Sequence, residues 1–119
     1  PLPQHGHWLV WVSGDRVERD VYLNPLAEDL NINIKMFDVA DNGEIVLYGD
    51  SKEHKGTDYV VLLDAQGSPK ATAAARQPKN GKIEAIVADD SGVWLFGHGY
   101  PTDEFSRFRF WSDRIQFIQ

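Results

Sequence analysis

The sequence predicts an all-β fold of about ten short antiparallel strands in several small sheets, arranged as open, propeller-blade-like hairpin repeats. Short segments rich in β-branched and aromatic residues alternate with turns built from Gly, Asp, Asn or Ser. In addition, one hairpin sequence recurs, and its closing glycines are 97 − 49 = 48 residues apart. The 119 residues suit a single domain, 1–119, and with no cysteine its core must hold without disulfides.

Five hairpins are expected along the chain, each closed by a polar turn. The Asn42-Gly43 pair in the second turn favours the positive φ angles of a tight hairpin. Residues 112–114 are expected to form the fifth turn. The predicted strand pairs are 8–12 with 17–23, 32–40 with 44–49, 59–64 with 69–75, 83–88 with 93–97, and 107–111 with 115–119.

Two segments depart from plain strand character. Residues 24–30 predict one turn of helix, because Asn24 can cap it and Pro25 can occupy its first position. The alanines of residues 71–75 favour helix, but prolines on both sides leave a window too short for an independent one. We therefore expect an edge strand or an irregular crossing there.

Alternation along two strands predicts which side chains form the core. Ile32, Ile34 and Met36 alternate with polar residues, and Phe108 and Phe110 alternate with arginines. Both apolar sets are expected to be buried. The same is expected of the four tryptophans, which all lie within predicted strands.

The repeat predicts half a unit followed by two whole four-stranded units. Residues 41–49 match residues 90–97, and the first hairpin resembles the second half of each unit. Two and a half blades are too few to close a propeller. We expect an open row of sheets; a sandwich, or a ring built from several chains, are the alternatives.

Charge and missing motifs narrow the function. The net charge is −6 and the pI is near 5.0, so the chain would be repelled by the phosphates of a nucleic acid. An acidic chain favours a basic partner protein instead. No apolar run approaches the ~18 residues of a membrane span. Because neither a nucleophile elbow nor a phosphate-binding loop is present, we expect no enzyme and no cofactor.

Three polar stretches hold all four histidines: residues 4–7, 50–58 and 98–104. If the units are equivalent, these stretches project from one rim, which is where binding residues on a β scaffold usually lie. Apolar side chains beside charges are typical of interfaces. The expected partner-binding residues are Asp50, Lys52, Glu53, His54, His98, Tyr100, Pro101, Asp103, Glu104 and Phe105.

Two chemical alternatives apply to the same rim. His5, His7, His54 and His98, with nearby carboxylates, would suit a metal, although their spacing matches no stringent motif. Asp103 or Glu104 facing Asp50 or Asp58 would suit an acid and base pair, but eighteen acidic residues make such a pair almost inevitable. We therefore favour partner binding and predict no metal or catalytic residue.

In residues 7–12, 41–49 and 97–101, and in its overall character, the chain resembles the small periplasmic immunity proteins of type VI secretion systems, in particular those that neutralise a muramidase effector. These segments are not diagnostic motifs, so no functional residue is carried over from the family. The resemblance implies a periplasmic protein, monomeric when free, that inserts loops into the groove of its cognate effector enzyme and blocks it.

The lipid anchor of such proteins is expected to have been removed with a leader, since the chain has no cysteine and begins at Pro1. The alternative is a blade-like protein that oligomerises into a ring and binds a small ligand such as a sugar.

Overall fold

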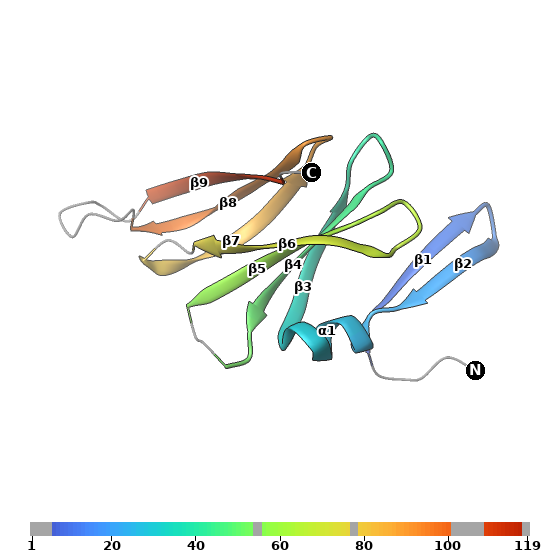
Figure 1. Cartoon of the computed structure of the whole chain (residues 1–119). Helices are drawn as coiled ribbons and strands as arrows, with labels where there is room; N and C mark the ends of the chain where they lie inside the picture. The colour runs from blue at the N-terminus through green and yellow to red at the C-terminus, as the bar shows by residue number, and fades with distance from the viewer. Residues whose placement is uncertain (1–5, 54–55, 77–78, 101–108, 118–119) are drawn as a thin grey trace.

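The computed structural model describes residues 6–53, 56–76, 79–100 and 109–117. This part of the chain forms nine strands and one short helix, as Figure 1 shows. The elements are β1 (Trp8–Ser13), β2 (Arg16–Tyr22), α1 (Asn24–Leu30), β3 (Ile32–Val39), β4 (Ile45–Ser51), β5 (Thr57–Leu63), β6 (Pro69–Arg76), β7 (Lys79–Ala88), β8 (Gly92–Tyr100) and β9 (Arg109–Gln116).

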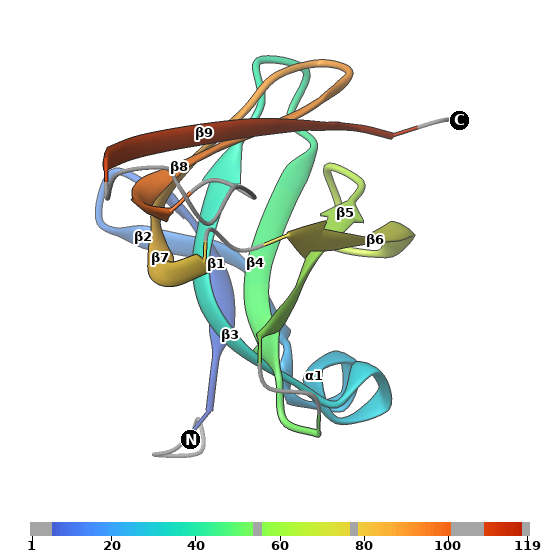
Figure 2. The ribbon, with the colours of Figure 1, turned by 90° about the vertical axis from the view of Figure 1, so that its left-hand side faces the viewer.

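The strands form three antiparallel sheets, which confirms the all-β class of small sheets. Sheet A pairs β1 with β2, sheet B has the order β3-β4-β5-β6, and sheet C has the order β7-β8-β9. The described residues form an elongated row measuring 52 × 29 × 28 Å, with sheet B in the middle (Figure 1). Figure 2 looks along this row from the side of sheet C.

Sheet B is the centre of the molecule because both of its faces are covered. On one face, Ile45 and Leu47 pack with Leu9 of sheet A and with α1. On the other face, Val46 and Tyr48 pack with Val93, Leu95 and other residues of sheet C. Consecutive side chains of a strand point to opposite faces, so the unbroken apolar run of β4 is buried throughout.

The 48-residue repeat has a structural cause at its closing glycines. Gly49 lies opposite Ile34, where β3 has an irregularity, and Gly97 lies opposite Ile83, where β7 has one. A Cβ atom at Gly49 would collide with the carbonyl oxygen of Asn33, and one at Gly97 with that of Lys82. The two β-bulges therefore require glycine on the neighbouring strand.

The predicted fifth hairpin is wrong. Residues 109–116 form one continuous strand, β9, in which Ser112, Asp113 and Arg114 pair with Phe96, Leu95 and Trp94 of β8. A long-range contact explains why this polar triplet does not turn: the Arg114 side chain donates to Asp89 and Ser91 in the turn before β8. In the described residues the second unit thus has three strands, whereas the first has four.

The two irregular segments behave largely as expected. Residues 69–76 form β6, an edge strand of sheet B. The helix forms over residues 24–30, but Leu23 occupies the N-cap position and no side chain caps it. Instead, the Asn24 side-chain oxygen accepts a hydrogen bond from the backbone N–H of His7, 2.9 Å away, and so ties the chain before β1 to the helix.

Candidate functional site

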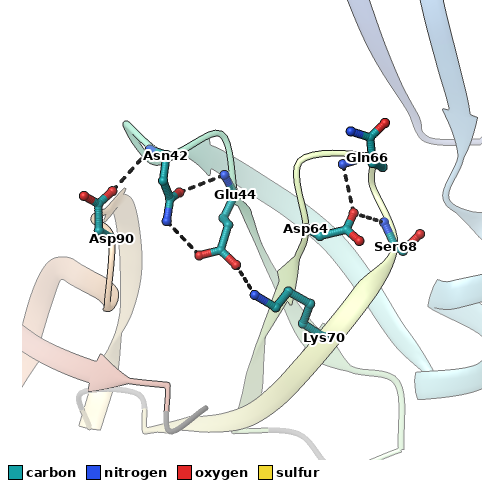
Figure 3. Close-up of polar contacts among 7 residues, drawn as sticks. All are labelled: Asn42, Glu44, Asp64, Gln66, Ser68, Lys70 and Asp90. Atoms are coloured by element: carbon teal, nitrogen blue, oxygen red, sulfur yellow. Dashed lines mark hydrogen bonds and ion pairs between the residues drawn. The ribbon is translucent and has the colours of Figure 1, made fainter.

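The polar turns of sheets B and C are held by side-chain to backbone hydrogen bonds (Figure 3). Asp64 accepts from the backbone N–H groups of Gln66 and Ser68. Asp89 accepts in the same way from Ser91 and Gly92. In both cases the pKa of the carboxyl lies below its ordinary value, mainly because backbone N–H groups stabilise the charged form: that of Ser68 for Asp64 and that of Ser91 for Asp89.

The turns before β4 and β8 also contact each other. The backbone N–H of Asn42 donates to the Asp90 carboxylate at 3.2 Å, which links equivalent turns of the two repeats (Figure 3). Glu44, in the turn before β4, forms an ion pair with Lys70 (Figure 3). The hydrogen bond that Lys70 donates within this pair is the main reason that the pKa of Glu44 is lowered. These acidic residues therefore have structural roles at the tips of the hairpins.

Three of the predicted binding residues lie at the end of β4 and just beyond it. Asp50 forms an ion pair with Lys35 on β3, with the atoms 3.1 Å apart, and Asp58 faces it in the register of β5. Asp58 is fully buried and accepts a hydrogen bond from the Tyr48 hydroxyl. Lys52 and Glu53 are exposed in the connection to β5.

The second group of predicted residues lies in sheet C. His98 belongs to β8, not to a loop, and its Nδ1 lies 2.9 Å from the Glu84 carboxylate. Tyr100 is the last residue of β8. Five of the predicted binding residues lie outside the described part of the chain: His54, Pro101, Asp103, Glu104 and Phe105.

The described residues bring only part of the expected rim together. His7 and Lys52 line one pocket of about 190 Å³ beside α1, together with Glu28 and Asn24. His98 is in another sheet, and in both views the end of β8 lies away from the end of β4 (Figures 1 and 2). His5, which was expected on the same rim, lies outside the described residues.

The largest departure from the sequence prediction is on the outer face of sheet C, the face turned away from sheet B. Trp94 and Phe110 were expected in the core, yet their side chains are 40% and 58% exposed. Phe96 stands between them, with its ring centroid 6.4 Å from that of Trp94 and 6.0 Å from that of Phe110. The Arg114 guanidinium lies 5.3 Å from the centroid of Trp94.

We call this surface the aromatic face, and its members come from all three strands of sheet C. They are Val87 on β7, Trp94, Phe96 and His98 on β8, and Phe110 and Arg114 on β9. His98 packs edge-on against Phe110 at 5.9 Å between ring centroids. Of the predicted binding residues, His98 alone has its described side chain on this face. The alternation of side chains along β8 and β9 predicts that the aromatic residues share one face of sheet C. Only the structure shows that this face is exposed.

A second apolar surface is a trough of about 220 Å³ beside β1. It lies between β1 and the part of sheet B that sheet A leaves uncovered, where Phe37 and Val39 are exposed. No pattern in the sequence predicts this surface. The residues that line it are Trp8, Leu9, Val10, Trp11, Phe37, Val39 and Ile45.

The described ranges hold no cluster of three or more His, Asp or Glu side chains suited to a metal ion. Nor does this part of the chain contain a helix long and apolar enough to cross a membrane. Both exposed apolar surfaces are built from strands, and the chemistry they offer is apolar and aromatic contact.

No family model, curated protein or solved structure matches the chain.

Proposed function

We propose that this chain is a non-catalytic binding protein that docks onto a partner protein through the aromatic face of sheet C. The observation that carries the proposal is the exposure of Trp94 and Phe110 beside Phe96. Large aromatic side chains and arginine are enriched among the residues that contribute most to protein interfaces.

The repeat shows that this exposure is unusual for the position. Adding 48 residues to Val46 and Tyr48 gives Trp94 and Phe96. Val46 and Tyr48 are buried where sheet B packs against sheet C, whereas their equivalents in sheet C face outwards. The aromatic face therefore has the composition of a packed sheet interface and, among the described residues, lacks a covering layer.

The partner class that we propose is the muramidase effector of a type VI secretion system, so that the chain acts as a periplasmic immunity protein. The resemblance described above motivates this choice, and the net charge of −6 suits a basic partner. In this proposal the aromatic face anchors the effector, and residues 50–58 and 97–105 are the segments that block its groove.

The test uses purified muramidase effectors of type VI systems as the probe. Titration calorimetry gives the affinity, and hydrolysis of peptidoglycan in the presence of the chain gives the inhibition. We expect a one-to-one complex whose dissociation constant rises about 100-fold or more when Trp94→Ser and Phe110→Ser are combined, since truncating a central aromatic anchor costs about 2 kcal/mol or more.

The matched control for this test is Val12→Ser, which removes an exposed apolar side chain at the opposite end of the row. It should leave the affinity within twofold. Equal affinities for the wild type and the Trp94→Ser/Phe110→Ser variant would remove the aromatic face as the docking surface. Lys52→Glu tests the first blocking segment separately, because Lys52 lies in the connection between β4 and β5 and not in sheet C.

The row of rings also favours a second candidate, a glycan. The electron-rich faces of aromatic rings attract partly positive groups, and the C–H face of a sugar ring is one of them. Titration with oligomers of N-acetylglucosamine, followed by tryptophan fluorescence, distinguishes the two. A saturable change that Phe110→Ser abolishes, while the reporting Trp94 is kept, would favour the glycan over the protein partner.

A further inference from the structure

The trough beside β1 offers a second binding surface, independent of the aromatic face. The structure assigns it to an extended β-strand of another protein, with apolar side chains at alternate positions, that pairs with the free edge of β1. Three observations lead to this occupant: the direction of the backbone groups of β1, the position of the trough along that edge, and the chemistry of its lining.

The free backbone groups of β1 follow from its pairing with β2. The backbone N–H of Leu23 donates to the carbonyl of His7, so His7 and Leu23 occupy a hydrogen-bonded position of the antiparallel ladder, although the His7 N–H donates to the Asn24 side chain instead. Hydrogen-bonded and non-hydrogen-bonded pairs alternate along an antiparallel ladder. The next non-bonded pairs are Trp8 with Tyr22 and Val10 with Asp20. The N–H and C=O groups of Trp8 and Val10 therefore point away from β2.

The trough runs along the same edge. Consecutive side chains of a strand point to opposite faces, so a surface lined by four successive residues, Trp8 to Trp11, follows the strand edge and not one face. In the described part of the chain β1 pairs with β2 alone. An unpaired edge of this kind is a template for a further strand.

The lining determines what that strand must carry. All seven lining residues are apolar. Leu9 and Ile45 also belong to the buried cluster between sheets A and B, so an apolar side chain entering the trough would extend an interface that already exists. Phe37 and Val39, both exposed on β3, supply the opposite wall. An extended backbone with apolar side chains satisfies the edge and the lining together.

Sheet A has a reason to accept a third strand. A two-stranded hairpin is marginally stable, and three strands with an apolar face are the usual minimum for independent stability. Here the hairpin is supported by sheet B on one side, while exposed Val10 borders the trough. An added strand would cover Val10, Phe37 and Val39 at once.

The experiment uses the whole chain and a defined probe. The probe is a fluorescein-labelled peptide of alternating Thr and Val with a Lys at each end, and its binding is followed by fluorescence anisotropy. Its control has the same side chains but N-methyl groups on alternate amides, which removes the N–H donors of one strand edge. We expect saturable binding of the probe and at least tenfold weaker binding of the N-methylated peptide.

The protein variants separate the backbone from the side chain at one residue. Val10→Pro removes the N–H that faces the trough and leaves the bonds to β2 in place, whereas Val10→Thr keeps that N–H and the β-branched shape. We expect at least tenfold weaker binding for Val10→Pro and less than a twofold change for Val10→Thr. Circular dichroism and thermal unfolding check that both variants are folded.

Phe37→Ser and Val39→Ser test the wall without touching the backbone of β1, and should weaken binding at least fivefold each even if Val10→Pro does not fold. Binding that is saturable but equal in all these variants would overturn the assignment, as would no binding of the probe. Self-association of the chain that Val10→Pro abolishes would replace the proposed partner by a second copy. Trp94→Ser should have no effect on the probe, which keeps this surface distinct from the aromatic face.

Discussion

At the scale of single residues, the closing glycines of the repeat show how one absent side chain permits a bend in the neighbouring strand. Gly49 and Gly97 lie opposite bulged segments, and a Cβ at either position would meet a backbone carbonyl that cannot rotate away. The sequence marks both positions, because each ends a matching stretch of the repeat. Their function in packing is visible only once the bulges are known.

We expect Gly49→Ala and Gly97→Ala each to lower the free energy of unfolding by about 1–3 kcal/mol, the usual cost of forcing an extra methyl group into a packed site. Urea denaturation measures this cost. Ala74→Ser adds an atom to an exposed position of edge strand β6 and should change stability by less than about 0.5 kcal/mol. Alanine variants as stable as the wild type would show that the strands separate freely at the bulges.

The three carboxyls with lowered pKa values predict how stability depends on pH. A carboxyl whose pKa is lower in the folded chain stabilises the fold above its unfolded pKa, and that contribution is lost as the pH falls through the folded pKa. The ordinary values are 4.5 for Glu44 and 3.8 for Asp64 and Asp89. Stability from these groups should therefore be constant near neutral pH and should fall in acid, below these values.

Asp89→Asn tests this sign at one site, because the amide keeps an acceptor oxygen for the turn but loses the charge that Ser91 and Arg114 stabilise. We expect the variant to be less stable than the wild type at pH 7, with a smaller difference at pH 3, which lies below the ordinary Asp pKa of 3.8. Urea titrations at pH 7, 5 and 3 measure it. A difference that does not change with pH would mean that the charge has no role.

At the scale of elements, four of the five hairpins could be predicted because their turns carry strong local signals. Gly14, Gly43 and Gly67 adopt positive φ angles in the first three turns, as their positions suggest. The triplet of residues 112–114 has no glycine. Its arginine, Arg114, makes hydrogen bonds across sheet C instead of taking part in a turn. Arg114 reaches a turn that lies 25 residues earlier in the chain, and no local pattern shows such a partner.

The joint between sheets B and C depends on a polar contact of the same kind. The Asp38 carboxylate on β3 accepts a hydrogen bond from the backbone N–H of Ala88 on β7, 2.7 Å away. We expect Asp38→Ala to destabilise the chain by about 1–3 kcal/mol, because it leaves this partly buried N–H without its acceptor.

Asp38→Asn keeps an acceptor oxygen and should cost less than half as much. Amide hydrogen exchange at Ala88, measured by NMR, should accelerate in the alanine variant and stay slow in the asparagine variant. Unchanged protection of the Ala88 amide in Asp38→Ala would show that the joint is held by apolar packing alone.

At the scale of the whole molecule, alternation predicts the two faces of each strand but not which face another sheet covers. In β4 both faces are covered, whereas in β8 Leu95 is buried and Trp94 is exposed, although the two stretches match in sequence. The candidate surfaces depend on that difference. For this reason the aromatic face and the trough could not be predicted from the sequence, while the class of fold could.

The central position of sheet B predicts that the three sheets unfold together. Leu47 lies in the joint between sheets A and B, and Leu95 in the joint between sheets B and C; both side chains are fully buried. Leu47→Ala and Leu95→Ala should each lower the free energy of unfolding by about 2–5 kcal/mol. In the described part of the chain sheet A has two strands and sheet C has three, which is at most the usual minimum for independent stability. Loss of either joint should therefore weaken the whole row and not one end of it.

The measurement compares two probes of the same denaturation: far-ultraviolet circular dichroism, which follows all strands, and the fluorescence of Trp94 in a variant whose other tryptophans are replaced by phenylalanine. We expect coincident transitions in the parent variant and in both leucine variants. If Leu47→Ala left the Trp94 transition in place while the dichroism shifted, sheet C would fold without sheet A. The row would then consist of separable units, as in repeat proteins whose neighbours are only weakly coupled.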